Sequence, residues 1–126
     1  MKLILAIAAG GAIGAVARHI VAHQVALLFG HGFHLGTLVV NVLGSLLLGG
    51  LIETLAIAWS PSAAVRGLLA VGILGAFTTF SAFSMDVLLF YERGQWAAAA
   101  LYITASVMLS LTALVVGLRL ARLVLV

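Results

Sequence analysis

Four long apolar stretches, separated by short polar turns, account for almost the whole chain. They cover residues 3–29, 35–59, 61–91 and 96–124. About 20 apolar residues in a helix cross the roughly 30 Å hydrocarbon core of a bilayer, so each stretch is long enough to span it. Breaker residues occupy the turns: a Gly-His-Gly turn at 30–32, Ser60-Pro61 as cap and first-turn proline, and a polar turn at 92–95. The pattern predicts an all-α membrane protein, with residues 1–126 forming one domain of four transmembrane helices.

Composition supports a membrane protein and excludes several other classes. Of 126 residues, 65% are hydrophobic and 7% are charged, whereas soluble domains carry about 25% charged residues. The net charge of +3 comes from scattered cations, which do not indicate a nucleic-acid partner. The absence of cysteine excludes disulfides and thiolate metal sites. The sequence contains no nucleophile–base set, phosphate loop or carboxylate pair, so we do not expect an enzyme.

The first apolar stretch leads directly into further spans, so we interpret it as a retained helix rather than a secretory signal. Charges near the ends of the spans give only a weak orientation signal. One side carries Lys2, Arg66, Arg119 and Arg122, and the other carries Arg93, with Arg18 as a further candidate. Such a small excess predicts that the chain can insert in either direction.

Glycines and a cation share one face of the first span, because Gly10, Gly14 and Arg18 recur every four residues. The Gly10-x-x-x-Gly14 spacing is typical of closely packed helices. Arg18 follows an uncharged run that is too short to span the hydrocarbon. It either extends its side chain to the interface or faces a watery vestibule where it would attract anions.

Two other spans carry polar stripes. In the second span Thr37, Asn41, Ser45 and Gly49 lie on one face, and in the fourth span Tyr102, Ser106 and Ser110 do so. A membrane asparagine commonly joins helices by hydrogen bonds, and hydroxyls commonly bond backbone carbonyls. The alternative is a polar track that offers amide and hydroxyl donors to an anion. Histidines 19, 23, 31 and 34 gather toward one membrane face, where we expect them to be solvated.

The third span has hydroxyls and phenylalanines at its centre, in the sequence Gly-Ala-Phe-Thr-Thr-Phe-Ser-Ala-Phe-Ser at residues 75–84. The midpoint between Arg66 and Glu92, which bracket the span, is residue 79, so this cluster is expected near the bilayer centre. Two threonines close to a glycine weaken a helix, and unwound carbonyls at such depth suit a cation such as Na⁺. The positive ring edges of Phe80 and Phe83 could contact an anion. The alternative is a continuous helix with packed threonines and lipid-facing rings.

Three motifs in order resemble the small bacterial fluoride channels of the CrcB/Fluc family across nearly the whole chain. The third-span motif is the most specific. The others are Gly-Gly-Ala-Ile-Gly-Ala-Val-Ala-Arg at residues 10–18 and Thr-Leu-Val-Val-Asn-Val-Leu-Gly-Ser at residues 37–45. The resemblance implies an antiparallel, dual-topology homodimer in the bacterial inner membrane. It also implies two symmetric pathways for passive, electrogenic export of fluoride.

Family resemblance also implies roles for individual residues. Asn41 would be a hydrogen-bond donor in the pore, and Phe80 and Phe83 would contact fluoride through their ring edges. Carbonyls of Gly75 and Thr78 from both subunits would hold a structural Na⁺. The remaining predicted residues are the vestibule cation Arg18 and a polar track of Ser81, Tyr102, Ser106 and Ser110. Two positions depart from the family pattern: Ala82 replaces a threonine, and Asp86 stands where glutamate is usual.

Three other functions compete with this interpretation. A small dual-topology, proton-coupled multidrug exporter would need a carboxylate in the first span, and residues 3–29 contain none. A fluoride/proton antiporter would couple proton movement to fluoride. A membrane assembly subunit would account for the packed glycines but not for the buried Thr-Thr-Phe-Ser cluster.

Overall fold

The computed structural model describes residues 1–31 and 34–126, and the chain there is helical apart from short connections. The elements are α1 Lys2–Phe29, α2 Leu35–Ile57, α3 Ala63–Arg66, the π-helix η1 Gly67–Leu74, α4 Gly75–Phe77, α5 Phe80–Glu92 and α6 Trp96–Leu125. Among these residues, four helical segments are long and apolar enough to cross a membrane, with Ala63–Glu92 counted as one. Gly30 ends α1 with φ 82°, whereas the predicted turn at Gly32 lies outside the described residues.

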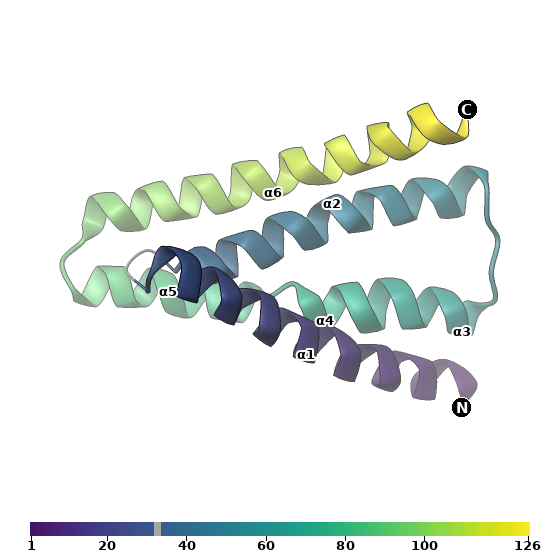
Figure 1. The fold of residues 1–126 in the computed structure, drawn as a ribbon, viewed down its shortest axis with the longest axis horizontal. Coiled ribbons are helices and arrows are strands. Elements are labelled where there is room, and N and C mark those ends of the chain that lie inside the picture. Colours follow the sequence, from purple (N-terminus) through teal and green to yellow (C-terminus); the bar gives the residue numbers. More distant parts are fainter. Residues whose placement is uncertain (32–33) are drawn as a thin grey trace.

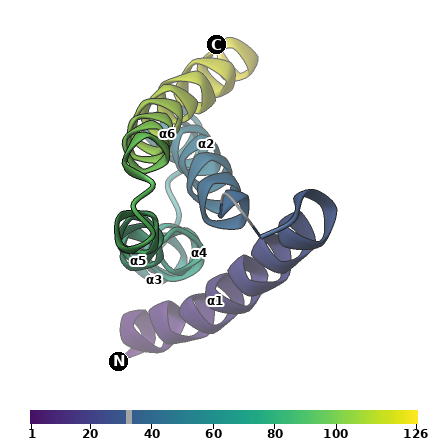
Figure 2. The same ribbon diagram turned by 90° about the vertical axis from the view of Figure 1, so that its left-hand side faces the viewer.

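The spans pack closely in two pairs (Figures 1 and 2). The first pair is α2 with α6, and the second is α1 with the first half of the third span, which consists of η1 and α4. Helix α5 lies against α6 but has far fewer contacts with the rest of the chain. Both termini lie at the same end of the molecule, as an even number of membrane crossings requires (Figure 1).

Glycines permit the close approach of both pairs. A Cβ atom added to Gly14 would overlap the carbonyl oxygen of Ile73 in η1, and one added to Gly49 would overlap the carbonyl oxygen of Leu114 in α6. Backbones this close gain dispersion contacts that larger side chains would prevent. The predicted packing role of the Gly10-x-x-x-Gly14 face is confirmed, because Gly10 lies against Gly72 of η1.

Two local expectations are wrong or incomplete. The cap before α3 is Ser62 rather than Ser60, since the Ser62 hydroxyl accepts a hydrogen bond from the Val65 amide at 3.4 Å. Serines flank Pro61 on both sides, and only the later one precedes the first helical turn. The π-helical stretch was not predicted; there the Gly75 amide reaches back to the Ala70 carbonyl, and such i→i+5 bonding widens the helix.

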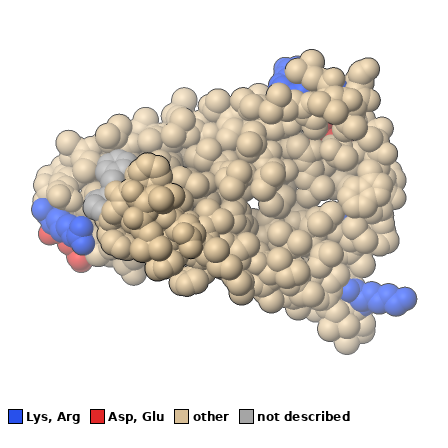
Figure 3. Space-filling view, in the orientation of Figure 1, with Lys and Arg blue, Asp and Glu red and all other residues tan. Residues whose placement is uncertain are grey.

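Charged side chains lie toward the two ends of the molecule, and the middle of the face in Figure 3 is free of them. An ion pair also ties α2 to α6: Glu53 is buried and its Oε1 accepts from Arg122 Nε at 2.5 Å.

Many large apolar side chains are exposed, among them Val71, Met85 and Leu111. This distribution is expected of helices surrounded by lipid or by a second copy rather than by water.

Gly14→Ala should destabilise the fold by about 1–3 kcal/mol, because the new methyl group meets backbone that no rotamer change can clear. The matched control is Gly11→Ala, whose Cβ meets nothing within 4 Å. Thermal unfolding in detergent would compare the two. Equal melting temperatures for both variants would contradict the role of the Gly14 contact.

Candidate functional site

The third span is interrupted at two threonines. Helix α4 ends at Phe77 and α5 begins at Phe80, and between them Thr78 (φ −82°, ψ 157°) and Thr79 (φ −153°, ψ 116°) have extended backbone. Both hydroxyls bond locally. Thr78 Oγ1 donates to the Leu74 carbonyl at 3.1 Å, and Thr79 Oγ1 accepts from the Ala82 amide at 3.1 Å as the N-cap of α5. The interruption is therefore a capped junction between two helices.

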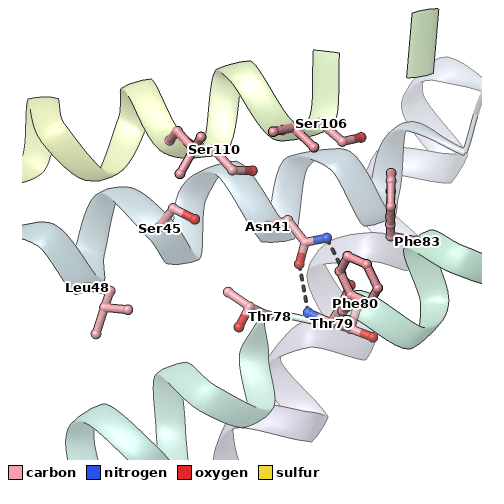
Figure 4. A pocket seen from close by; sticks show the side chains of 11 residues that line it. Asn41, Ser45, Leu48, Thr78, Thr79, Phe80, Phe83, Ser106 and Ser110 are labelled. Atoms are coloured by element: carbon pink, nitrogen blue, oxygen red, sulfur yellow. Dashed lines mark hydrogen bonds between the residues drawn. The ribbon is translucent and has the colours of Figure 1, made fainter. Parts of the chain in front are cut away.

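Asn41 of α2 forms hydrogen bonds with the non-helical backbone at this junction (Figure 4). Its Nδ2 donates to the Thr79 carbonyl at 3.0 Å, and its Oδ1 accepts from the Thr79 amide at 2.7 Å. In a continuous helix the Thr79 amide would donate to the Gly75 carbonyl, so Asn41 frees that carbonyl. One further N–H of the Asn41 amide is not used in this pair of bonds. Asn41 thus joins helices, and it retains a donor for another partner.

A cavity of about 360 Å³ lies beside the junction, between α2, α5 and α6 (Figure 4). Its lining mixes amide, hydroxyl and ring groups: Asn41, Ser45, Leu48, Thr78, Thr79, Phe80, Phe83, Ser106, Val107, Ser110 and Leu111. Six residues predicted from the sequence thus line one cavity: Asn41, Thr78, Phe80, Phe83, Ser106 and Ser110. Ser106 Oγ is buried and has no hydrogen-bond partner within the described ranges. Buried polar atoms nearly always have a hydrogen-bond partner, so this hydroxyl on the cavity lining is a candidate donor to a guest in the cavity.

The two predicted aromatic residues differ in their surroundings. Phe83 is buried and stacks on Tyr102 at a centroid distance of 5.7 Å. Phe80 lies 5.3 Å from Phe83, but 77% of its surface is exposed. The Phe80 ring therefore completes the aromatic wall from the outer edge of the chain, where it is open to lipid or to another subunit.

Tyr102 lies next to this wall rather than in the cavity lining. It is fully buried, and its hydroxyl donates to Asp86 Oδ2 at 2.8 Å. The other carboxylate oxygen, Asp86 Oδ1, lies 3.1 Å from His34 Nδ1. The expectation that His34 is solvated is wrong, because α5 brings Asp86 against the start of α2. A sequence signal existed: Phe83, Asp86 and Phe90 fall on one helical face, and all three are buried.

The remaining predicted residues lie farther from the cavity. Ser81 is exposed, and its Oγ lies 3.2 Å from Thr79 Oγ1. Gly75 is exposed in α4, and Arg18 is half-buried on α1. In the part of the chain that the structure describes, neither Arg18 nor Gly75 lines this cavity. The sequence analysis placed Thr79 in the central cluster but did not identify it as the hydrogen-bond partner of Asn41.

Comparison with known proteins places the chain among relatives of similar length. Residues 5–118 match the family described as "CrcB-like protein, Camphor Resistance (CrcB)". A protein of Rhodospirillum centenum is 48% identical over 97% of both chains, and one of Chelativorans sp. is 50% identical over 97% of this chain and 98% of its own. A Nitrobacter hamburgensis protein is 49% identical over 94% of both chains.

The first two relatives are named "Fluoride-specific ion channel FluC", and the third is named "Fluoride-specific ion channel FluC 1". The four long apolar helices and these relatives together indicate a multi-pass membrane protein. Because both the family match and the relatives cover nearly the whole sequence, the chain belongs to the CrcB family.

Proposed function

We propose that this protein is a fluoride-selective ion channel that lowers cytoplasmic fluoride by passive, electrogenic export. The names of relatives 48–50% identical support fluoride as the ion. The structural observation that carries the proposal is the cavity of amide, hydroxyl and ring groups beside the Thr78–Thr79 junction. Polar groups in a membrane-spanning segment are costly unless they pair or line a pathway.

The cavity chemistry suits a small, weakly polarisable anion. Asn41 retains an amide N–H, Ser106 Oγ is unpartnered among the described residues, and Phe80 and Phe83 offer ring edges with positive partial charge. These donors are uncharged, so they can replace water around an anion without holding it permanently. Ser81, Ser110 and Tyr102 would extend the track, and Arg18 would attract anions at its mouth.

A second copy of the chain would complete the pathway. The Phe80 ring is 77% exposed at the edge of the cavity, and α5 has few contacts with the rest of its own chain. The weak charge bias permits insertion in both directions. The proposed assembly is therefore an antiparallel homodimer with two pathways, located in the bacterial inner membrane.

The junction also fits a structural Na⁺. The Thr79 amide bonds to Asn41 and leaves the Gly75 carbonyl free, and the Thr78 backbone is extended. Gly75 itself is exposed. Carbonyls of Gly75 and Thr78 from two copies would supply oxygen ligands, which are the groups that bind Na⁺ at unwound helices in membrane proteins. A bound cation would offset the partial negative charge of these carbonyls.

The membrane potential provides the driving force. Fluoride that enters an acidified cell as neutral HF dissociates inside, and an inside-negative potential favours anion exit by about 2.3 kcal/mol per charge per 100 mV. Coupling to protons is not needed for this transport. A fluoride/proton antiporter is an alternative, and it would differ in moving protons in the direction opposite to fluoride.

Liposomes that contain the purified protein, fluoride and chloride should release fluoride rapidly when a potassium ionophore carries the compensating charge, and should retain chloride. Ion-selective electrodes would record both anions. A fluoride/proton antiporter would also need the ionophore, because fluoride that leaves and protons that enter both make the lumen more positive. It would be recognised by acidification of the lumen in proportion to the fluoride released. Absence of fluoride release from a verified dimer would overturn the proposed function.

Phe83→Ile and Phe80→Ile should each slow fluoride release by about tenfold, because isoleucine fills space but lacks the positive ring edge. Phe29→Ile is the matched control, since Phe29 is 70% exposed at the end of α1 and away from the cavity. The flux assay would be run on fractions of confirmed dimer. Wild-type rates of fluoride release in both cavity variants would show that the two rings do not take part in transport.

Asn41→Asp should slow fluoride release by at least about tenfold, because it places a negative charge on the cavity wall. It also removes the donor to the Thr79 carbonyl. Asn41→Ala separates the effect of charge, since it breaks both bonds to Thr79 without adding charge, whereas the Asp side chain keeps an acceptor for the Thr79 amide. The Asp variant should be the slower of the two; equal rates would mean that Asn41 acts only by holding the junction.

A further inference from the structure

A chain of polar contacts links the start of α2 to the aromatic wall of the cavity. His34 Nδ1 lies 3.1 Å from Asp86 Oδ1, and Asp86 Oδ2 accepts from the Tyr102 hydroxyl at 2.8 Å. The Tyr102 ring stacks on Phe83 at 5.7 Å, with 21° between the ring planes. Each carboxylate oxygen thus has its own partner, so Asp86 is held from both sides. A change at His34 would therefore reach the ring of Phe83.

His34 is held in an unusual conformation. It is the non-glycine residue with positive φ in the described chain (φ 50°, ψ 38°), and residues with a Cβ seldom adopt this left-handed region. Its ring packs edge-on against Phe90 at 5.4 Å. The Nε2 atom is buried without a hydrogen-bond partner among the described residues, so Asp86 is the polar contact that fixes the ring.

We propose that His34 is a positioning residue for the ion pathway: through Asp86 it holds Tyr102 and Phe83, and it does so more firmly when its imidazole is protonated. The inference rests on the proposed function. Histidine changes charge between about pH 5 and 8. A protonated imidazole forms a charge-assisted bond to Asp86, whereas a neutral one leaves a buried carboxylate without a compensating cation. Fluoride flux should therefore rise as the pH falls, when HF delivers most fluoride to the cell.

Among the described groups around His34, the charged partner is Asp86. Asp86 comes from α5 and Tyr102 from α6. On α1 the residues that share a second, smaller cavity with His34 are Ala22 and Ala26, which carry no charge. The other titratable groups on this part of α1, His19 and His23, are exposed and stack on each other at a centroid distance of 6.1 Å. The same cavity includes His31, which makes His31 the other group able to titrate there.

Asparagine at position 34 separates positioning from titration. Its Nδ2 takes the place of the histidine Nδ1 and can donate to Asp86, and asparagine tolerates the left-handed conformation better than most residues. His34→Asn therefore keeps the bond but removes the proton equilibrium. His34→Ala removes both. His31→Asn is the matched control, because it makes the same change in the same connection.

Ionophore-dependent fluoride release would be measured at pH 6 and pH 8, with leakage of HF from protein-free liposomes subtracted. Wild type and His31→Asn should be roughly three- to tenfold faster at pH 6, the difference expected between charge-assisted and neutral bonds. His34→Asn should differ by less than about twofold between the two pH values, and His34→Ala should be roughly tenfold slower than wild type at pH 6. A wild-type pH profile in folded His34→Asn would overturn the proposal.

Tyr102→Phe tests whether His34 acts through Asp86, because it keeps the ring on Phe83 but removes the hydroxyl that bonds Asp86. In this background His34→Asn should cause no further change in the pH profile, so the two effects are not additive. Additive effects would contradict the chain of contacts. If the wild-type protein releases no fluoride, both the proposed function and this inference fail. If the wild-type protein releases fluoride and His34→Asn has the same pH profile, only the role of His34 is contradicted.

Discussion

A backbone inside an apolar helical protein must find its hydrogen bonds within the protein, and the Asn41 side chain satisfies this requirement where the third span stops being helical. Its amide bonds both the N–H and the C=O of Thr79, as a neighbouring peptide group would. Without such a partner, two unpaired backbone groups in a lipid environment would cost several kcal/mol each. The junction, the start of α5 and the position of Phe83 all depend on this pair of bonds.

Helix α2 can hold the junction because it is itself fixed by close packing. Gly49 lies against the α6 backbone, and Gly117 of α6 lies against the carbonyl of Leu46. The ion pair between the buried Glu53 and the half-exposed Arg122 ties the same two helices near their ends. The small residues that seem featureless in the sequence therefore set the spacing at which Asn41, Ser106 and Ser110 face one cavity.

Periodicity predicted much of this arrangement, because a helix places every third or fourth residue on one face. The polar stripes on the second and fourth spans and the cluster at residues 75–84 do meet at a cavity. Periodicity does not identify the residue on another segment that a side chain will contact. It places Asn41 on a face without identifying Thr79 as its partner. It also does not bring His34, which precedes α2, to Asp86 of α5. The π-helical hydrogen bonding of η1 was not predicted, because a one-residue shift in backbone bonding leaves no pattern in the side chains. The roles of the site residues in transport stay predictions.

The cavity has one stiff wall and one compliant wall. Asn41, Ser45, Ser106 and Ser110 come from α2 and α6, whose backbones touch, whereas Phe80 and Phe83 come from α5, which has few contacts of its own. A wider guest would therefore displace α5 rather than spread the α2–α6 pair. The restoring force against that displacement comes from the Thr79 cap at the start of α5, from Asp86 one turn beyond Phe83, and from the packing of Phe90 against Tyr102. In the proposed pathway, discrimination by ionic radius would then depend on how strongly one short helix is anchored rather than on how tightly the whole protein is packed.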